Sequence, residues 1–202
     1  MTKGTPRRRV DYELIEEMIA EGSRVLDLGC GDGRLLAELE EKKGVTGRGV
    51  ELNEERVIEC VGRGLAVYHG DLLEGLSFYG DQSFDTVILS QTLQQTLDPR
   101  RVLREMLRVG RQAIISFPNF GHWIVRAQLM VTGRMPRTKH LPHQWYDTPN
   151  IHLLTVKDFR EFARAEKVRI LNEVFLNAAG ERLAAVLPNL RAATAIFQVE
   201  KA

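Results

Sequence analysis

The sequence predicts an α/β fold: a doubly wound, mostly parallel sheet with helices on both faces. Short apolar runs alternate with amphipathic helical stretches from about residue 24 to residue 117, and this alternation is typical of parallel strands joined by helical crossovers. A glycine-rich turn follows the first of these runs directly. The chain has 202 residues, 44% of them hydrophobic, which is enough to bury a core without disulfides or metals. We therefore expect a single domain over residues 1–202.

Seven strands are predicted, because seven short apolar runs are bounded by turn residues such as Gly29, Gly70 and Pro118. In chain order, these runs cover residues 24–28, 47–52, 65–69, 84–89, 111–117, 168–176 and 195–200. The first five follow one another with helices between most of them. The last two close the sheet after a long irregular stretch.

Five helices are predicted from apolar residues at helical spacing and from end signals. They cover residues 11–20, 34–43, 54–62, a stretch that begins at Asp98 and Pro99, and residues 155–166. Asn53 and Thr155 are suitable N-cap residues for two of these helices, and Gly44 ends a third. Pro99 fits the first helical turn, where a backbone N–H is not needed.

The stretch from about residue 120 to residue 150 breaks this rhythm with several glycine and proline residues. We expect an insertion, or lid, that lies over one edge of the sheet. No Asp or Glu occurs between Gln112 and Tyr146, whereas Trp123, Arg126 and Trp145 lie there. Aromatic and Arg side chains dominate interface energetics, so these three are predicted to bind a partner. The alternatives are a solvated loop with a few buried anchors, and tryptophans that close the core.

Composition excludes several classes of protein. The chain has 28 Lys and Arg against 27 Asp and Glu, and a net charge of +1 does not indicate a nucleic-acid partner. No apolar run approaches the ~18 residues of a membrane span, and no signal peptide is recognised. His122, His140 and His143 lack nearby Cys or acidic ligands, so no metal site is predicted. We expect a soluble, cytoplasmic protein with neither a nucleic-acid nor a membrane partner.

The most informative stretch is VLDLGCGDG, residues 25–33, where three glycines lie between a strand and a helix. Glycine permits a tight turn there and lets a ligand approach the backbone closely. Asp27 precedes the first glycine by two residues. A carboxylate there would repel a pyrophosphate at the helix N-terminus and would suit a ligand with a cationic ammonium group.

Two further acids end the next two predicted strands. Glu51 lies where open α/β sheets place a carboxylate that accepts hydrogen bonds from ribose hydroxyls. Asp71 follows the third strand, where its carboxylate and the Leu72 amide are suited to an adenine edge. Each acid alone would be read as an ordinary loop residue. Their joint placement at three strand ends predicts one ligand crevice.

VLDLGCGDG, followed by Glu51 and by Gly70-Asp71-Leu72, resembles the S-adenosylmethionine site of the class I methyltransferases. The resemblance implies a seven-stranded Rossmann-like sheet whose last strand is antiparallel, and S-adenosylmethionine or S-adenosylhomocysteine as the cofactor. The cofactor-binding residues that it implies are Asp27, Gly29, Cys30, Gly31, Gly33, Glu51, Leu52, Asp71, Leu72 and Ser90.

A closer resemblance extends over nearly the whole chain. The stretch from Leu89 to Trp123, together with LPHQWYDTPNIHLLTVKDF at residues 141–159, is similar to the methionine-biosynthesis MetW family. This resemblance implies a methyltransferase-like protein of methionine biosynthesis that acts with homoserine O-acyltransferase.

Catalysis is left open by the sequence. Small-molecule methyltransferases of this fold often have a Glu-His pair where Gln94 and Gln95 lie here, and a carboxamide cannot accept a proton at neutral pH. The first hypothesis is therefore a binding and regulatory subunit, with catalytic residues unknown. The alternative is an active methyltransferase of an unidentified small molecule. A nicotinamide-dependent oxidoreductase is disfavoured by Asp27 and by the G-x-G-x-G spacing.

Overall fold

The computed structural model describes residues 10–202, and residues 1–9 of the expected domain lie outside that range. The described residues form an eight-stranded sheet in the order β3-β2-β1-β4-β5-β8-β6-β7. Its strands are β1 (Arg24–Leu28), β2 (Thr46–Glu51), β3 (Val67–His69), β4 (Phe84–Ser90), β5 (Gly110–Pro118), β6 (Val168–Leu176), β7 (Arg182–Leu183) and β8 (Thr194–Lys201).

The strand directions confirm the predicted doubly wound, mostly parallel fold. The first five strands along the sheet pair in parallel, and β8 is antiparallel to both of its neighbours, β5 and β6. The expected count of seven strands is wrong by one. The additional strand, β7, has two residues and pairs with the end of β6 at the sheet edge. A strand of this length is too short to show alternation in the sequence.

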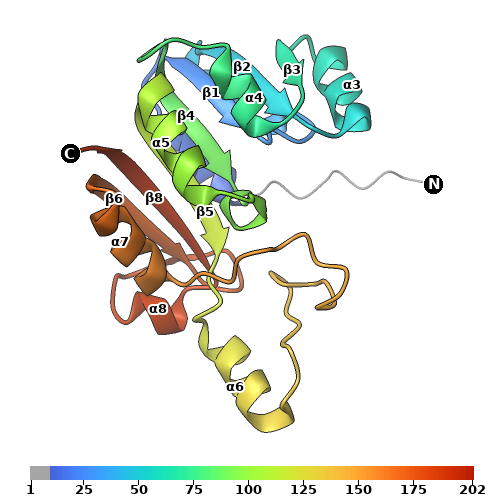
Figure 1. Cartoon of the computed structure of the whole chain (residues 1–202), viewed down its shortest axis with the longest axis vertical. Helices are drawn as coiled ribbons and strands as arrows, with labels where there is room; N and C mark the ends of the chain where they lie inside the picture. The colour runs from blue at the N-terminus through green and yellow to red at the C-terminus, as the bar shows by residue number, and fades with distance from the viewer. Residues whose placement is uncertain (1–9) are drawn as a thin grey trace.

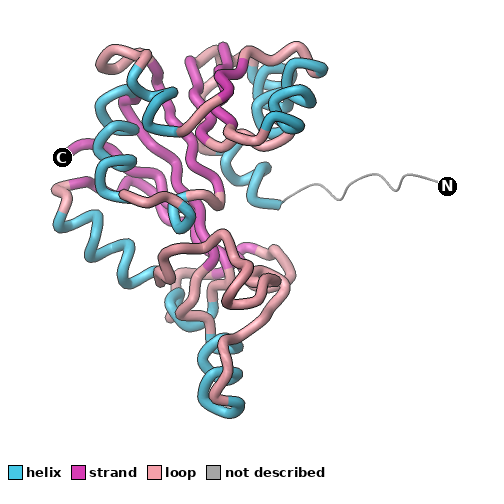
Figure 2. Tube along the Cα trace, turned by 45° about the vertical axis from the view of Figure 1, so that its right-hand side comes forward, coloured by secondary structure: helices cyan, strands magenta, loops and turns pink. Residues whose placement is uncertain are grey.

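Helices lie on both faces of the sheet (Figures 1 and 2). They are α1 (Val10–Glu17), α2 (Arg34–Lys43), α3 (Glu54–Gly62), α4 (Leu72–Ser77), α5 (Pro99–Val109), α6 (Trp123–Thr132), α7 (Val156–Ala165) and α8 (Pro188–Arg191), with a 3-10 turn, η1, at Leu93–Gln95. The predicted caps are confirmed: Asn53 accepts a hydrogen bond from the Arg56 amide, and Thr155 forms a capping box with Asp158. Helices α4, α6 and α8 and the η1 turn were not predicted.

Two hydrophobic clusters occupy the two faces of the sheet. Buried residues of α4, α5 and α7 belong to one cluster, and buried residues of α1, α2 and α3 belong to the other. Phe197 of β8 is stacked on Phe117 of β5, with ring centroids 5.7 Å apart, and it also contacts Phe159 of α7. No helix within residues 10–202 combines the length and apolar character of a membrane span.

The 120–150 segment extends beyond the carboxyl end of β5, and α6 points away from the sheet (Figure 1). The expectation that it lies over an edge of the sheet is therefore wrong. The reason is in the backbone hydrogen bonds at its two ends: the Phe120 amide bonds to the Leu154 carbonyl, and the Ile151 and His152 amides bond to the Gln94 carbonyl. Both ends are thus held at the carboxyl ends of β4 and β5.

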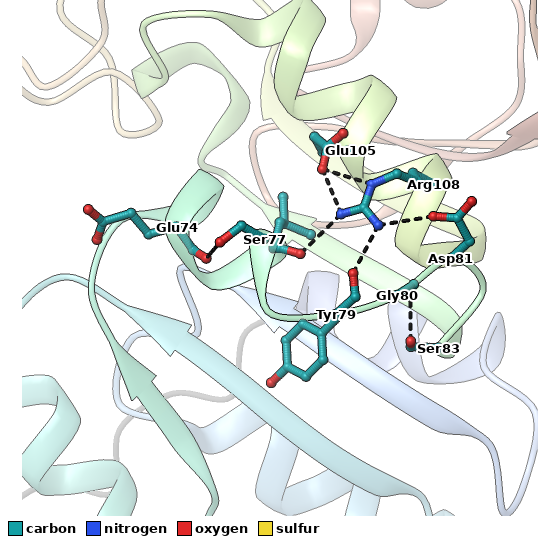
Figure 3. Close-up of polar contacts among 9 residues, drawn as sticks. Glu74, Ser77, Tyr79, Gly80, Asp81, Ser83, Glu105 and Arg108 are labelled. Carbon is teal, nitrogen blue, oxygen red and sulfur yellow. Dashed lines mark hydrogen bonds and ion pairs between the residues drawn. The ribbon is translucent and has the colours of Figure 1, made fainter.

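Arg108, in the last turn of α5, joins that helix to the end of α4 (Figure 3). Its guanidinium donates hydrogen bonds to the Tyr79 carbonyl at 2.9 Å and to the Leu76 carbonyl at 3.2 Å. It also forms ion pairs with Glu105 at 2.7 Å and with Asp81 at 3.1 Å. Since α4 begins at Leu72, this network holds the loop that follows β3.

Replacing Arg108 by Met should lower the free energy of unfolding by about 1–2 kcal/mol, because two carbonyls and two carboxylates lose a charged donor at a partly exposed position. Urea unfolding measures this change. Arg101→Met, at an exposed position of the same helix, is the matched control and should change stability by less than about 0.5 kcal/mol. Equal effects of the two substitutions would show that the network does not stabilise α4.

Candidate functional site

The glycine turn between β1 and α2 adopts a backbone that requires glycine. Gly29, Gly31 and Gly33 have φ angles of 69°, 60° and 74°, all in the left-handed region. At Gly33 a Cβ atom would also lie 2.4 Å from Leu65 Cδ1. The Gly29 and Cys30 amides both donate to the Val50 carbonyl of β2, at 2.8 and 3.1 Å. The turn is therefore hydrogen-bonded to the neighbouring strand, β2.

Glu51, the last residue of β2, is buried and is bonded to this turn. Its Oε2 accepts a hydrogen bond from the Gly31 amide at 2.8 Å. Its Oε1 accepts from the Leu52 and Asn53 amides at 3.0 and 2.9 Å. An ionised carboxylate has about four acceptor positions, so these three bonds leave room for a further donor. The acid after β2 and the glycine turn after β1 are thus one hydrogen-bonded unit.

Asp27 lies in the middle of the parallel sheet at the point where the strand order reverses. It is only 2% exposed, and it is in register with Gly49 of β2 and Ile88 of β4. Open α/β sheets bind ligands outside the carboxyl ends of strands at this reversal. The sequence predicts that Asp27 lines a ligand crevice, and in the structure it lies in β1, two residues before the first glycine of the turn.

Asp71 has a local structural role that the sequence did not indicate. Its Oδ1 accepts from the Leu73 amide at 2.8 Å, which makes it the N-cap of α4. Leu72, the first residue of α4, is half-buried against the core. Leu52, just after β2, is exposed, and its carbonyl is 3.1 Å from His69 Nε2. The Gly70 amide bonds to the Glu51 carbonyl, so the exits of β2 and β3 are adjacent.

The turn after β4 lies at the next strand end along the sheet from β1. Ser90 Oγ lies 3.1 Å from Ser116 Oγ of β5, and the Gln91 amide donates to the same Ser116 hydroxyl at 3.1 Å. Gln91 has a left-handed φ of 57°, and its carbonyl accepts from the side-chain amides of Gln94 and Gln95, at 2.7 and 3.0 Å. Sequence reasoning missed Gln91 and Ser116. A polar residue inside the apolar run of β5 was the available signal for Ser116.

Both cysteines are buried beside the glycine turn. Cys30 Sγ and Cys60 Sγ are 3.8 Å apart, and the Cys60 thiol donates to the Gly31 carbonyl at 3.2 Å. Burial, then the negative charge of Asp27, raises the pKa of Cys30. Burial also raises the pKa of Cys60. The thiolate is the nucleophile, so neither residue is suited to nucleophilic chemistry.

At pH 8 the two thiols should react with iodoacetamide at least about tenfold more slowly in the folded protein than in urea. At pH 8, each unit by which burial raises the pKa of a thiol lowers the fraction of that thiol present as thiolate about tenfold. Mass spectrometry of the alkylated chain measures the rate. Rapid labelling of either cysteine in the folded state would contradict the raised pKa values.

The three residues predicted to bind a partner do not have equivalent environments. Trp123, at the start of α6, is 54% exposed, and Trp145 is 72% exposed. The alternative that these tryptophans close the core is therefore wrong. Arg126 Nε instead donates to the Gly121 carbonyl at 2.6 Å, a bond that stabilises the first turn of α6. Further exposed apolar residues lie near the tryptophans in sequence: Leu129, Met130, Val131, Met135 and Tyr146.

Residues 10–202 hold no group of three or more His, Cys, Asp or Glu side chains placed to bind a metal ion. His122 and His140 contribute instead to the lining of a cavity at the base of α6, away from the glycine turn.

The family model of the methionine biosynthesis protein MetW matches residues 9–199. A bifunctional methionine biosynthesis protein MetXA/MetW from Rhodopirellula baltica is 40% identical over 93% of this chain, which covers 32% of that relative. A ubiquinone/menaquinone biosynthesis C-methyltransferase, UbiE, from Stenotrophomonas maltophilia is 34% identical over 58% of the chain, which covers 51% of that relative. The chain thus spans about a third to about half of the length of these relatives.

Two solved structures show the same fold. A SAM-dependent methyltransferase from Thermotoga maritima superposes with a TM-score of 0.65 at 16% identity, over 96% of this chain and 90% of that one. Another, from Archaeoglobus fulgidus, superposes with a TM-score of 0.62 at 18% identity, over 94% of each chain. At this identity the likeness shows the fold alone, which is that of the class I methyltransferases. Because the family match extends over nearly the whole chain and agrees with this fold, the chain belongs to the MetW family of methionine biosynthesis proteins.

Proposed function

We propose that the chain binds S-adenosylmethionine or S-adenosylhomocysteine in the crevice at the carboxyl ends of β1, β2 and β3. With this ligand bound, the chain acts as a regulatory subunit that associates with homoserine O-acyltransferase. The observation that carries the proposal is the hydrogen bond between the Glu51 carboxylate and the Gly31 amide, at 2.8 Å. It joins an acid suited to ribose hydroxyls to a glycine turn that a ligand can approach closely.

Each part of the cofactor has a matching group in the crevice. Asp27 supplies a buried negative charge for the ammonium group, and Glu51 retains acceptor capacity for a ribose hydroxyl. The Leu72 amide lies in the first turn of α4, where N–H groups have no acceptor within the helix, so it is available to an adenine nitrogen. When bound, S-adenosylmethionine supplies an activated methyl group. The residues named here bind and orient the cofactor.

The side chains of Gln94 and Gln95 support a regulatory role. Both donate to the Gln91 carbonyl, so they stabilise the turn after β4 and offer no proton acceptor. A catalytic methyltransferase is the second candidate, favoured by the methyltransferase names of relatives such as UbiE.

The partner is inferred from the Rhodopirellula relative, whose name combines MetXA with MetW in one bifunctional protein. In that relative a single polypeptide carries both parts, which raises the effective concentration of each part near the other. We assign the association to the α6 surface, defined as Trp123, Leu129, Met130, Val131, Met135, Trp145 and Tyr146, all exposed. The stretch from Gln112 to Tyr146 has basic residues and no acids, so the complementary patch on the acyltransferase is apolar with an acidic rim.

The test combines calorimetry with an activity assay. The purified chain is titrated with S-adenosylmethionine and with S-adenosylhomocysteine, and one or both should bind. The acyltransferase of the same organism is then assayed alone and with the chain, at several S-adenosylmethionine concentrations. Its rate should change when the chain is present and should depend on the ligand. Release of S-adenosylhomocysteine that depends on a small-molecule acceptor would favour the catalytic alternative, and failure of both ligands to bind would overturn the proposal.

A further inference from the structure

A cavity of about 260 Å³ lies at the base of α6, outside the proposed cofactor crevice. Its lining comes from the exit of β5, one face of α6, the 138–141 turn, and the residues before β7 and β8. The lining residues are Asn119, His122, Ile124, Val125, Gln128, Thr138, Lys139, His140, Leu141, Ala178 and Ala193. None of these belongs to the glycine turn or to the strand-end acids. The cavity is therefore a separate feature of the fold.

The walls of this cavity are fixed by the structure around them. Asn119 Oδ1 accepts from the Gly121 and Val156 amides, at 3.0 and 3.2 Å, and its Nδ2 donates to the Ala192 carbonyl at 2.7 Å. Thr138 and Leu141 exchange two backbone hydrogen bonds. These hydrogen bonds fix the positions of Asn119 and of the 138–141 turn in the cavity wall.

Three polar groups in the lining are available to a ligand. Gln128 Oε1 is buried and has no hydrogen-bond partner among the described residues, so it needs an N–H or O–H donor. Lys139 supplies a cation, and no lining residue is acidic.

The third group is His122, which is only 6% exposed. Its Nδ1 accepts from the Ile124 amide. Burial, followed by the nearby His140, lowers the pKa of His122. The ring is therefore neutral at pH 7 and carries its proton on Nε2, where it is a donor.

We propose that this cavity binds a small organic anion: a carboxylate with a short apolar body and one hydroxyl group. Lys139 forms an ion pair with the carboxylate, and His122 Nε2 donates a hydrogen bond to it. Gln128 Oε1 accepts a hydrogen bond from the hydroxyl. The apolar body packs on Ile124, Val125 and Leu141. An engineered cavity of roughly 150 Å³ holds benzene, so this cavity holds a ligand of roughly ten non-hydrogen atoms.

The cavity also contacts the helix that carries the α6 surface of the proposed function. The cavity contacts Ile124, Val125 and Gln128 of α6, whereas Trp123 and Met130 of the same helix are exposed. A ligand in the cavity would contact α6 and so stabilise the position of the helix that carries the α6 surface.

The probe is (S)-2-hydroxy-4-methylpentanoate, titrated into the full chain by calorimetry. Two analogues isolate the polar groups: 4-methylpentanoate lacks the hydroxyl, and 2-hydroxy-4-methylpentanamide lacks the charge. The hydroxy acid should bind about tenfold more tightly than either analogue. Excess S-adenosylhomocysteine should leave its affinity unchanged. Absence of binding by the hydroxy acid, or competition by S-adenosylhomocysteine, would overturn the assignment. The outcome does not depend on whether the proposed crevice binds its own ligand.

Two variants test the named contacts. Gln128→Leu should abolish the preference for the hydroxyl, and Lys139→Met, at an exposed position, should abolish the preference for the acid over the amide. Ile58→Ala, on the exposed face of α3, is the control and should leave all three affinities unchanged. Should Gln128→Leu fail to fold, Lys139→Met decides alone. Retention of both preferences in folded variants would refute the site.

Discussion

Replacing Glu51 by Ala should weaken binding of S-adenosylhomocysteine by about 1–3 kcal/mol, because a charged acceptor for ribose hydroxyls is lost. The same substitution should lower the free energy of unfolding by about 1–3 kcal/mol. The Gly31, Leu52 and Asn53 amides all donate to this carboxylate in the folded state. Calorimetry and urea unfolding on the same variant measure the two losses.

A second substitution separates the ligand contact from the structural contact. Glu51→Gln keeps a carbonyl oxygen for the Leu52 and Asn53 amides but removes the charge. It should regain part of the stability that Glu51→Ala loses, while its affinity for S-adenosylhomocysteine stays weakened. Glu54→Ala, at the exposed start of α3, is the matched control and should alter neither quantity. Unchanged affinity in folded Glu51→Ala would mean that the ribose does not lie at Glu51.

Most of the fold was predictable because its signals are local. The alternation of apolar runs with helical stretches predicted β1 to β5, and short-range capping predicted the helix starts at Asn53 and Thr155. The 120–150 segment was not predictable in the same way. Its glycine and proline residues indicated an irregular loop, yet Gly133 ends a ten-residue helix, α6, in the left-handed conformation. The residues of α6, WIVRAQLMVT, are apolar at most positions, so no apolar stripe at helical spacing marked the helix in the sequence.

The position of the candidate site followed from the ends of the strands, whereas its internal bonds did not. Parallel strands place their carboxyl ends at one edge of a sheet, so Glu51 and the glycine turn were expected to be neighbours. The hydrogen bond from the Gly31 amide to Glu51 depends on how closely two segments approach across the fold. The same is true of Arg126, whose bond to the Gly121 carbonyl depends on the backbone at the start of α6.

Replacing Trp145 by Ala should weaken association with homoserine O-acyltransferase by about 2 kcal/mol or more, if the α6 surface is the contact. A tryptophan that is 72% exposed in the free chain gains its buried contacts only in the complex. Its truncation should therefore change the free energy of unfolding by less than about 0.5 kcal/mol. Affinity for S-adenosylhomocysteine should also stay unchanged, because Trp145 belongs to neither the glycine turn nor the strand-end acids.

The matched control is Ile58→Ala, which removes an exposed apolar side chain from α3, at 65% exposure. That helix packs against β2 and β3 and lies far from α6 (Figure 1), so association should be unaffected. The combined variant Trp123→Ala, Met130→Ala and Trp145→Ala should remove detectable association in co-purification while the chain stays folded. Because Met130 is 82% exposed and Trp123 is 54% exposed, none of the three truncations opens a cavity in the core. Association that survives in the folded triple variant would place the acyltransferase on another face, and α6 would then serve only as a cover for the cavity at its base.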